Sequence, residues 1–291
     1  MPDALISVIL PVKNGMPFLK ESIDSILNQT EPRFKLFVIN DHSTDGSTDY
    51  VKSLKDERII LLENTGAGLV DALNLGLASA GTEFIARMDA DDISHPERFE
   101  MQLKSFRENK NVVLVGTWYE YFANNPCYKS IAVKLPVDNK SIIRKMEKAE
   151  NALCHPTVMI HKSVLDDIGY YDKGSFPAED YDIFFRLIEK GELANIPMVL
   201  HKFRITQNSV FSRNAVQSSS KYSQIRNKYV SINGGKKKSP ILTPYSMALY
   251  RKGLFFYLNG KIVKPLFYFT LSFILAPKRG FNFFFKNFIK K

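Results

Sequence analysis

The first half of the chain alternates short apolar runs with amphipathic segments, and this alternation limits the folds open to it. Four runs rich in aliphatic residues, "ISVILPV", "KLFVIND", "RIILLEN" and "EFIARMD", are typical of strands. A segment with helical periodicity follows each run, at residues 18–29, 42–54, 68–80 and 96–106. Repeated strand–helix units predict an α/β fold, in which helices cover both faces of a parallel sheet.

The periodicity is less regular beyond about residue 110. "NVVLVGTWYEYF" (111–122) predicts further strands, and residues 155–172 predict a strand, a short helix and a turn. "AEDYDIFFRLIEKG" (178–191) predicts a helix that ends at Gly191. The sequence has no internal repeat, and its 45% of hydrophobic residues suffices for a sizeable core.

Polar residues follow each of the four predicted strands. They are Asn14 and Gly15, then Asp41, then residues 64–66, and finally residues 89–92. Ligands of open parallel sheets bind beyond the carboxyl ends of the strands, so we expect a site at this edge. Carboxylates and amides alone bind an anion poorly, but a cation that bridges them to a phosphate removes the conflict.

The densest cluster of charge is "DADD", directly after the fourth predicted strand. Asp89 and Asp91 can share Mg²⁺ or Mn²⁺ through oxygen ligands, which leaves coordination positions open for substrate phosphate oxygens. A calcium-binding loop is excluded because the segment lacks the required Gly and because Pro96 interrupts it. The alternative is a helix N-terminus, where the helix dipole favours acidic residues.

Two further loops carry candidate ligand contacts. Asp41 can accept hydrogen bonds from a ribose hydroxyl or a base N–H, and a turn with a helix cap is the alternative. In "NTGAGLVDAL", Asp71 takes the place of the third Gly of a dinucleotide fingerprint, and the absence of a Lys-Ser/Thr pair excludes a P-loop. Gly66 and Gly68 are expected to lie at the start of a helix and to contact an anion.

Acidic residues also open the helix predicted at 178–191. Glu179 and Asp180 are either first-turn acids or include a general base aimed at an acceptor hydroxyl, with the helix as a rigid mount. The five histidines, at positions 42, 95, 155, 161 and 201, show no metal-binding spacing. His155, which precedes Pro156, is expected to be a turn or pocket-wall residue.

Charge is distributed unevenly along the chain. Residues 193–291 contain 18 Lys and Arg and no Asp or Glu, whereas the first 192 residues hold 22 basic and 30 acidic residues, a net −8. A basic C-terminal part suggests a polyanionic partner, either nucleic acid or anionic lipid. Cys127 and Cys154 provide no disulfide framework and the N-terminus has no basic leader, so we expect a cytoplasmic protein.

The C-terminal region, residues 240–291, combines basic residues with many aromatic ones and has no acidic residue. Its longest apolar stretch, 266–276, has 11 residues, whereas a bilayer span needs about 20, so we expect no transmembrane helix. "GFNFFFKNFIKK" (280–291) predicts an interfacial anchor, with aromatics at headgroup depth and lysines facing anionic lipid. The apolar content argues against a nucleic-acid-binding arm. The alternative is that the aromatics pack on the rest of the chain or form a dimer contact.

Together these motifs resemble the family 2 glycosyltransferases, which have the GT-A fold. The similar elements, in the family's order and at about its spacing, are "SVILPVKNG", "SILNQT", "FVINDHSTDGS", "NTGAG", "IARMDADD", "HPTVMIHKSVLDDIGYYD" and "AEDYDIFFRL". The match covers residues 5 to about 205, roughly two thirds of the chain. It implies a GT-A catalytic domain at 1–205, with a mostly parallel sheet flanked by helices, and a basic, aromatic, helical extension at 206–291.

The resemblance also implies roles for individual residues. Asp91 and Asp89 match the family's metal-binding pair for Mn²⁺ or Mg²⁺, and Asp180 matches its catalytic base. Substrate contacts are implied for Pro11, Val12, Asn14, Asp41, Gly66, Arg87, Asp89 and Glu179. Asn14 stands where an acidic residue is frequent in the family, and Arg204 matches the family's downstream arginine segment only loosely.

The implied reaction transfers a sugar from a nucleotide-sugar donor, most commonly a UDP-sugar, to a hydroxyl of a glycan or lipid-linked acceptor, with inversion at C1. The implied setting is bacterial polysaccharide, lipopolysaccharide or capsule synthesis at the inner face of the cell membrane. The residues leave two alternatives open. A sugar-phosphate nucleotidyltransferase also uses paired carboxylates and a metal, and a nucleic-acid-binding protein would use the basic C-terminal part.

Overall fold

The computed structural model describes residues 3–123, 130–206, 210–232, 249, 253–254, 256–258 and 263–275. In this part of the chain, nine strands form a single sheet. The strands are β1 (Ile6–Val12), β2 (Phe34–Asn40), β3 (Ile59–Glu63), β4 (Phe84–Arg87), β5 (Ile93–Ser94), β6 (Val112–Phe122), β7 (Ile131–Val133), β8 (Met159–His161) and β9 (Glu192–Arg204).

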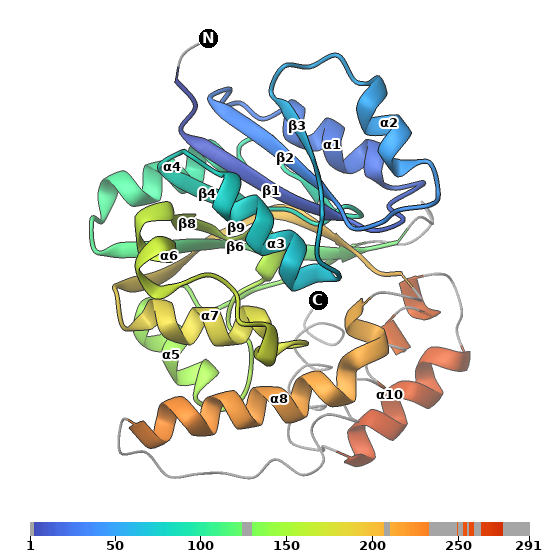
Figure 1. The fold of residues 1–291 in the computed structure, drawn as a ribbon. Coiled ribbons are helices and arrows are strands. Elements are labelled where there is room, and N and C mark those ends of the chain that lie inside the picture. The colour runs from blue at the N-terminus through green and yellow to red at the C-terminus, as the bar shows by residue number, and fades with distance from the viewer. Residues whose placement is uncertain are drawn as a thin grey trace.

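Helices cover both faces of the sheet (Figure 1). They are α1 (Leu19–Leu27), α2 (Ser47–Ser53), α3 (Leu69–Ser79), α4 (Arg98–Glu108), α5 (Asn139–Met146), α6 (Lys162–Ile168), α7 (Glu179–Ile188), α8 (Val210–Ile232) and α10 (Val263–Leu275), with short 3₁₀ helices at His155–Thr157 and Lys173–Ser175. The helices expected after the first four strands are all present. The fourth begins at Arg98, so Pro96 precedes the helix instead of lying in its first turn.

The strand order is β3-β2-β1-β4-β8-β6-β9-β5, with β7 paired to β6. The first four strands in this order are parallel, as predicted, and Val12 at the end of β1 lies opposite Asn40 at the end of β2. Beyond β4 the sheet is mixed, because β8 is antiparallel to both of its neighbours while β6 and β9 are parallel. The expectation of a mostly parallel sheet therefore holds for the strand–helix repeats, whose helices supply the crossovers that parallel pairing needs.

Burial on both faces of β1 explains its continuous apolar run. Successive side chains of a strand point to opposite faces. Val8 and Leu10 pack in one cluster with Ile23 of α1 and Phe99 of α4. Ile9 points the other way and packs in a second cluster with residues of α3 and α7. The whole strand is buried, as the continuous apolar run requires.

The described part of the C-terminal extension packs on the rest of the molecule. Helix α8 lies along α7 (Figure 1), and Nε of its Arg226 donates to the carbonyl of Glu147, directly after α5, at 2.8 Å. Leu254 and Leu258 are buried in a cluster with Tyr121 of β6. Among the described helices, none has the length and apolar character needed to cross a membrane. The anchor expected at 280–291 lies outside the described residues and stays a prediction.

Candidate active site

Hydrogen bonds fasten the loops after β1 and β2 to each other. Asn14 has a φ of 53°, in the left-handed region that Asn tolerates, and its Oδ1 accepts the N–H of Thr44 at 2.8 Å. In return, the N–H groups of Asn14 and Gly15 donate to the hydroxyls of Ser43 and Ser47, each at 2.9 Å. Asn14 thus shapes this loop, and its contact with a substrate stays a prediction.

Asp41 is buried where β2 ends, and it links three strand ends. Its N–H donates to the carbonyl of Val12 at 2.7 Å. Its Oδ1 accepts Nδ2 of Asn64 at 2.8 Å and the N–H of Gly68 at 3.0 Å. Its Oδ2 pairs with Nζ of Lys13 at 3.1 Å. Burial by itself raises the pKa of Asp41. The hydrogen bonds and the charge of Lys13 lower it by more, so the pKa of Asp41 lies below its usual value.

The glycine loop, residues 64–68, turns tightly between β3 and α3. The N–H of Gly66 donates to Oδ1 of Asn64 at 3.1 Å, and its carbonyl lies 2.9 Å from Nε2 of His42. A Cβ on residue 66 would collide with the carboxylate of Asp71. The residue that precedes α3 is Gly68, with a φ of 89°. Gly66 therefore allows the loop to close on Asp71, and its anion contact stays a prediction.

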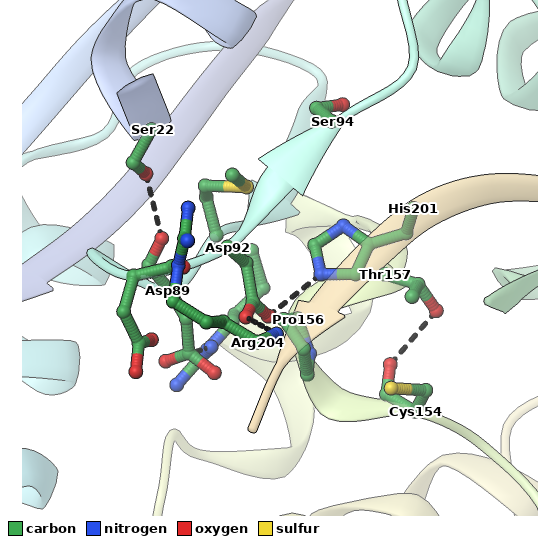
Figure 2. Close-up of polar contacts among 12 residues, drawn as sticks. Ser22, Asp89, Asp92, Ser94, Cys154, Pro156, Thr157, His201 and Arg204 are labelled. Carbon is green, nitrogen blue, oxygen red and sulfur yellow. Dashed lines mark hydrogen bonds and ion pairs between the residues drawn. The ribbon is translucent and has the colours of Figure 1, made fainter. Parts of the chain in front are cut away.

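The acidic segment, residues 89–92, contains one aspartate with a structural task. Asp92 is buried, with its Oδ2 2.7 Å from Nε2 of His201 and its Oδ1 accepting the N–H of Arg204 at 2.8 Å (Figure 2). Nδ1 of His201 lies 3.4 Å from Nη1 of Arg98. Because a guanidinium can only donate, Nε2 of His201 carries the proton that it shares with Asp92. Both oxygens of Asp92 are thus occupied in tying the acidic segment to β9.

Asp89 and Asp91 remain as candidate metal ligands. Asp89 forms an ion pair with the buried Arg87, and its carbonyl accepts the hydroxyl of Ser22 at 2.7 Å (Figure 2). The carboxylate of Asp91 has no side-chain hydrogen-bond donor among the described residues. Burial, followed by the charges of Asp92 and Asp89, raises the pKa of Asp91 well above its usual range. A cation shared by Asp91 and Asp89 would relieve this repulsion.

Arg204, whose role the sequence leaves open, adds side-chain contacts between the end of β9 and the acidic segment. Its Nε donates to the carbonyl of Asp91 at 2.6 Å, and its guanidinium pairs with Glu21. The guanidinium carbon lies 4.4 Å from the ring centroids of both Phe18 and Phe122. Arg204 therefore helps to set the path of the acidic segment, which is a structural task.

Glu179 and Asp180 begin α7, as predicted, but their carboxylates have different neighbours. Oδ2 of Asp180 accepts Nδ2 of Asn151 at 2.8 Å, and Oδ1 lies 3.5 Å from the hydroxyl of Tyr222. Oε2 of Glu179 is buried and has no hydrogen-bond partner in the described part of the chain. Burial, followed by the charge of Asp180, raises the pKa of Glu179 to about 7. Burial also raises the pKa of Asp180.

The acidic segment and the start of α7 form one cluster around Arg87. The charge of Asp89 contributes to the raised pKa of Glu179, while the charge of Arg87 opposes the rise for both Glu179 and Asp180. Nε of Arg87 is also buried without a hydrogen-bond partner among the residues described. Buried polar atoms without partners are rare, and two in one cluster fit a site that a polar ligand completes.

The other predicted contacts lie along the same edge of the sheet. Asn14, Asp41 and Gly66 follow β1, β2 and β3, and Pro11 and Val12 are the buried last residues of β1. In the order β3-β2-β1-β4, these strands lie side by side, and the cluster around Arg87 adjoins them at the end of β4.

Some contacts near the cluster have no recognisable signal in the sequence. His155, expected to be a turn or pocket-wall residue, lies in a 3₁₀ helix, with Nε2 2.7 Å from the hydroxyl of Tyr171. Burial, followed by the charge of Arg87, lowers the pKa of His155 well below its usual range. Asn151 and Tyr222 reach Asp180 from segments 29 and 42 positions away, and no local pattern announces such a contact.

The chain has clear relatives among glycosyltransferases. The sequence profile of Glycosyl transferase family 2 matches residues 7–169. The Escherichia coli protein WfgD, a UDP-Glc:alpha-D-GlcNAc-diphosphoundecaprenol beta-1,3-glucosyltransferase, is 30% identical over 272 residues, which cover 90% of this chain and 100% of WfgD. An uncharacterized glycosyltransferase of Haemophilus influenzae is 31% identical over 219 residues, which cover 72% of this chain and 68% of that protein.

Solved structures share the fold at low sequence identity. Residues 1–349 of S. aureus TarS, in complex with UDP-GlcNAc, have a TM-score of 0.64 at 16% identity, with 95% of this chain and 82% of that chain covered. The mannosyltransferase PcManGT from Pyrobaculum calidifontis, in complex with GDP-Man and Mn²⁺, has a TM-score of 0.58 at 16% identity, with 93% and 75% covered. These likenesses confirm the predicted GT-A fold. Since the family profile matches more than half of its length, the chain belongs to glycosyltransferase family 2.

Proposed function

We propose that the chain transfers a sugar from a UDP-sugar donor to a hydroxyl of a lipid-linked glycan acceptor, with inversion at C1. The observation that carries this proposal is the cluster around Arg87, where the acidic segment meets Glu179 and Asp180 at the carboxyl edge of the sheet. The name of WfgD includes a UDP-sugar donor and a diphosphoundecaprenol-linked acceptor, which supports the choice of both substrates. Synthesis of a cell-surface polysaccharide is the setting that such an acceptor favours.

The acidic segment fits a divalent cation, Mn²⁺ or Mg²⁺, that has few protein ligands. In the residues that the structure describes, no three His, Cys, Asp or Glu side chains converge on a metal position. Asp91, whose carboxylate has no side-chain donor there, and Asp89 would hold the ion, with donor diphosphate oxygens as further ligands. When bound, the ion stabilises the negative charge that develops on the departing diphosphate.

The loops after β1, β2 and β3 are proposed to hold the nucleoside. Asp41 accepts three side-chain or backbone hydrogen bonds within the protein. A carboxylate has about four acceptor positions, so Asp41 retains capacity for a ribose hydroxyl or a base N–H. The backbone of Pro11 and Val12 would line the same pocket, with Asn14 and Gly66 at its rim.

Asp180 is proposed as the general base of the reaction. Asn151 holds its carboxylate, which takes the proton of the acceptor hydroxyl while the hydroxyl oxygen attacks C1 of the donor sugar. Attack opposite to the departing diphosphate inverts C1, and such proton removal contributes about 10²–10⁴-fold to the rate. Two buried atoms lack partners in the described part of the chain: Oε2 of Glu179 would accept a sugar hydroxyl, and Nε of Arg87 would donate to a sugar or phosphate oxygen.

The acceptor is proposed to be met at the cytoplasmic face of the cell membrane, with the enzyme bound peripherally. Residues 193–291 carry 18 basic and no acidic residues, which suits an anionic lipid surface. Phe267 of α10 is 63% exposed, as expected of an aromatic residue that enters the headgroup region. The aromatic residues favour lipid over nucleic acid as the polyanionic partner.

Thermal-shift screening of nucleoside diphosphates and sugar nucleotides, with and without Mn²⁺, tests the proposal. UDP-sugars with Mn²⁺ are expected to raise the Tm of the wild type, since ligand at 100 times its Kd stabilises by about 2.7 kcal/mol. Asp91→Asn is expected to fold normally and to lose the Mn²⁺-dependent part of the shift. The absence of a shift with every sugar nucleotide, or an undiminished Mn²⁺-dependent shift in Asp91→Asn, would contradict the proposal.

A further inference from the structure

We propose that Tyr222 of α8 is a positioning residue for Asp180, so that the C-terminal extension completes the active site. This inference rests on the proposed function, in which Asp180 is the general base. The hydroxyl of Tyr222 lies 3.5 Å from Oδ1 of Asp180, longer than the roughly 2.5–3.0 Å usual for an O–H···O hydrogen bond. Tyr222 reaches this position from a helix that lies along α7 and outside the expected catalytic domain at 1–205 (Figure 1).

Two stacked aromatic pairs fix α8 against α7. The ring of Tyr222 stacks on Tyr181 with centroids 4.4 Å apart and planes at 17°, and the ring of Tyr229 stacks on Phe185 at 4.9 Å and 5°. Residues seven apart on α8, or four apart on α7, share a helix face, so the pairs form one seam. Ile225, between the two tyrosines, is buried. This packing sets the position of the Tyr222 hydroxyl.

Donors from three segments surround the carboxylate of Asp180. Nδ2 of Asn151, in the segment after α5, donates to Oδ2 at 2.8 Å. The N–H of Tyr181 donates to Oδ1 at 2.7 Å, and the hydroxyl of Tyr222 approaches the same oxygen. A carboxylate has about four acceptor positions, so these donors fix its orientation and leave a position on Oδ2 for an acceptor hydroxyl. Catalytic hydrogen bonds that are long in the free enzyme often shorten in the substrate complex.

The hydroxyl of Tyr222 also affects how readily Asp180 ionises. The charged and titratable groups that face Asp180 are Arg87 of β4, Glu179 and Tyr181 of α7, Tyr222 of α8, and Tyr171 in the loop before α7. Burial raises the pKa of Asp180, whereas its hydrogen bonds and the charge of Arg87 lower it. Removal of the Tyr222 hydroxyl is therefore expected to raise the pKa of Asp180 further, and a base must be ionised to accept a proton.

Carboxyl ¹³C NMR of aspartate-labelled protein measures this titration without any substrate. The resonance of Asp180 is assigned from its loss in Asp180→Asn. Tyr222→Phe keeps the stacked ring and removes the hydroxyl, so the titration midpoint of Asp180 is expected to move to higher pH. Equal midpoints in the wild type and Tyr222→Phe would overturn the proposal.

Tyr229→Phe is the matched control for this experiment. The Tyr229 ring stacks on the same face of α7, and its hydroxyl lies 3.5 Å from Oδ1 of Asp182, a carboxylate outside the proposed chemistry. This variant is expected to leave the midpoint of Asp180 unchanged. A shift as large as that of Tyr222→Phe would show a general effect of loosening α8 and would also overturn the proposal.

Turnover separates a failure of this inference from a failure of the proposed function. With UDP-glucose, or the sugar nucleotide that gives a larger thermal shift, nucleoside diphosphate release is measured at several pH values. Tyr222→Phe is expected to lower kcat about three- to tenfold, the range for one hydrogen bond, and to leave the donor KM unchanged. If Asp180→Asn abolishes turnover while Tyr222→Phe keeps the wild-type kcat and pH profile, only the positioning role is wrong. If Asp180→Asn keeps turnover, the base assignment fails, and the positioning role fails with it.

Discussion

The acidic segment holds three aspartates in four positions, and each of them has different neighbours. Asp92 is buried with both oxygens hydrogen-bonded, and Asp89 is paired with Arg87. Asp91 has no side-chain hydrogen-bond donor among the described residues, and burial raises its pKa, like that of Asp92, well above the usual range. Their surroundings therefore give the three carboxylates different tasks. Asp92 is structural, the charge of Asp89 is partly neutralised by Arg87, and Asp91 would be stabilised by a cation.

Substitution of neighbouring aspartates should separate stability from function. In Asp92→Asn, the amide N–H₂ faces either the Nε2–H of His201 or the N–H of Arg204, so two donors oppose each other in a buried site. The expected loss is about 1–3 kcal/mol in the free energy of unfolding, measured by urea denaturation without nucleotide or Mn²⁺. Asp91→Asn, the matched control, should stay within about 0.5 kcal/mol of the wild type or exceed it. Equal losses in both variants would show that Asp91 is also structural.

At the residue scale, local spacing predicts which acids reach the edge of the sheet but not which groups they contact. Asp89, Asp91 and Asp180 follow a strand or open a helix, and local patterns locate such positions. The partners of Asp92 lie 109 and 112 positions away, on β9. Tertiary packing creates these contacts, so the structural task of Asp92 could not be predicted from sequence.

At the scale of elements, apolar runs predict the existence of strands better than their partners. The four strand–helix repeats appear as expected and pair in parallel. Beyond them, Val112–Phe122 form one long strand, β6, which is antiparallel to β8 and β7 and parallel to β9. A buried apolar run is compatible with parallel or antiparallel pairing, because the connection between two strands decides in which direction the second strand enters the sheet.

Close packing between elements is also hidden in the sequence. Gly76 lies in the middle of α3, where a Gly is normally unfavourable. A Cβ at this position would lie 2.8 Å from Cγ2 of Ile9 and 2.9 Å from Cδ1 of Ile39. The Gly therefore lets α3 approach β1 and β2, and it helps to place the glycine loop at the edge of the sheet.

At the scale of the whole molecule, the basic C-terminal extension is both packed and charged. Leu254 and Leu258 are buried against β6, and α8 stacks on α7. Whether the aromatic residues of 240–291 pack on the rest of the chain, form a dimer contact or enter a membrane stays a prediction. Phe267 of α10 remains exposed. The division into a domain at 1–205 and an extension at 206–291 stays a prediction. The stacked aromatic pairs between α7 and α8 show that the two parts pack against each other directly beside Asp180.

Flotation with lipid vesicles tests membrane attachment. Full-length protein is expected to float with anionic vesicles at low salt and less at high salt, because each basic residue near the surface contributes about 1 kcal/mol. A variant that lacks residues 280–291 should float less, and it retains Leu254 and Leu258, which pack on β6. Neutral vesicles serve as the control. Equal flotation of both proteins, or none by the full chain, would rule out an anchor in this segment.

The most direct test of the proposed transfer compares wild type with Asp180→Asn, using a UDP-sugar, Mn²⁺ and N-acetylglucosamine linked through diphosphate to a lipid. Turnover, the anomeric configuration of the product by NMR, and donor Kd by calorimetry are measured together. We expect the wild type to form an inverted linkage and Asp180→Asn to lose several orders of magnitude in kcat, with donor Kd within about twofold, because the base acts on the acceptor. Transfer retained by Asp180→Asn, or donor binding lost with it, would contradict the assignment of Asp180 as the base.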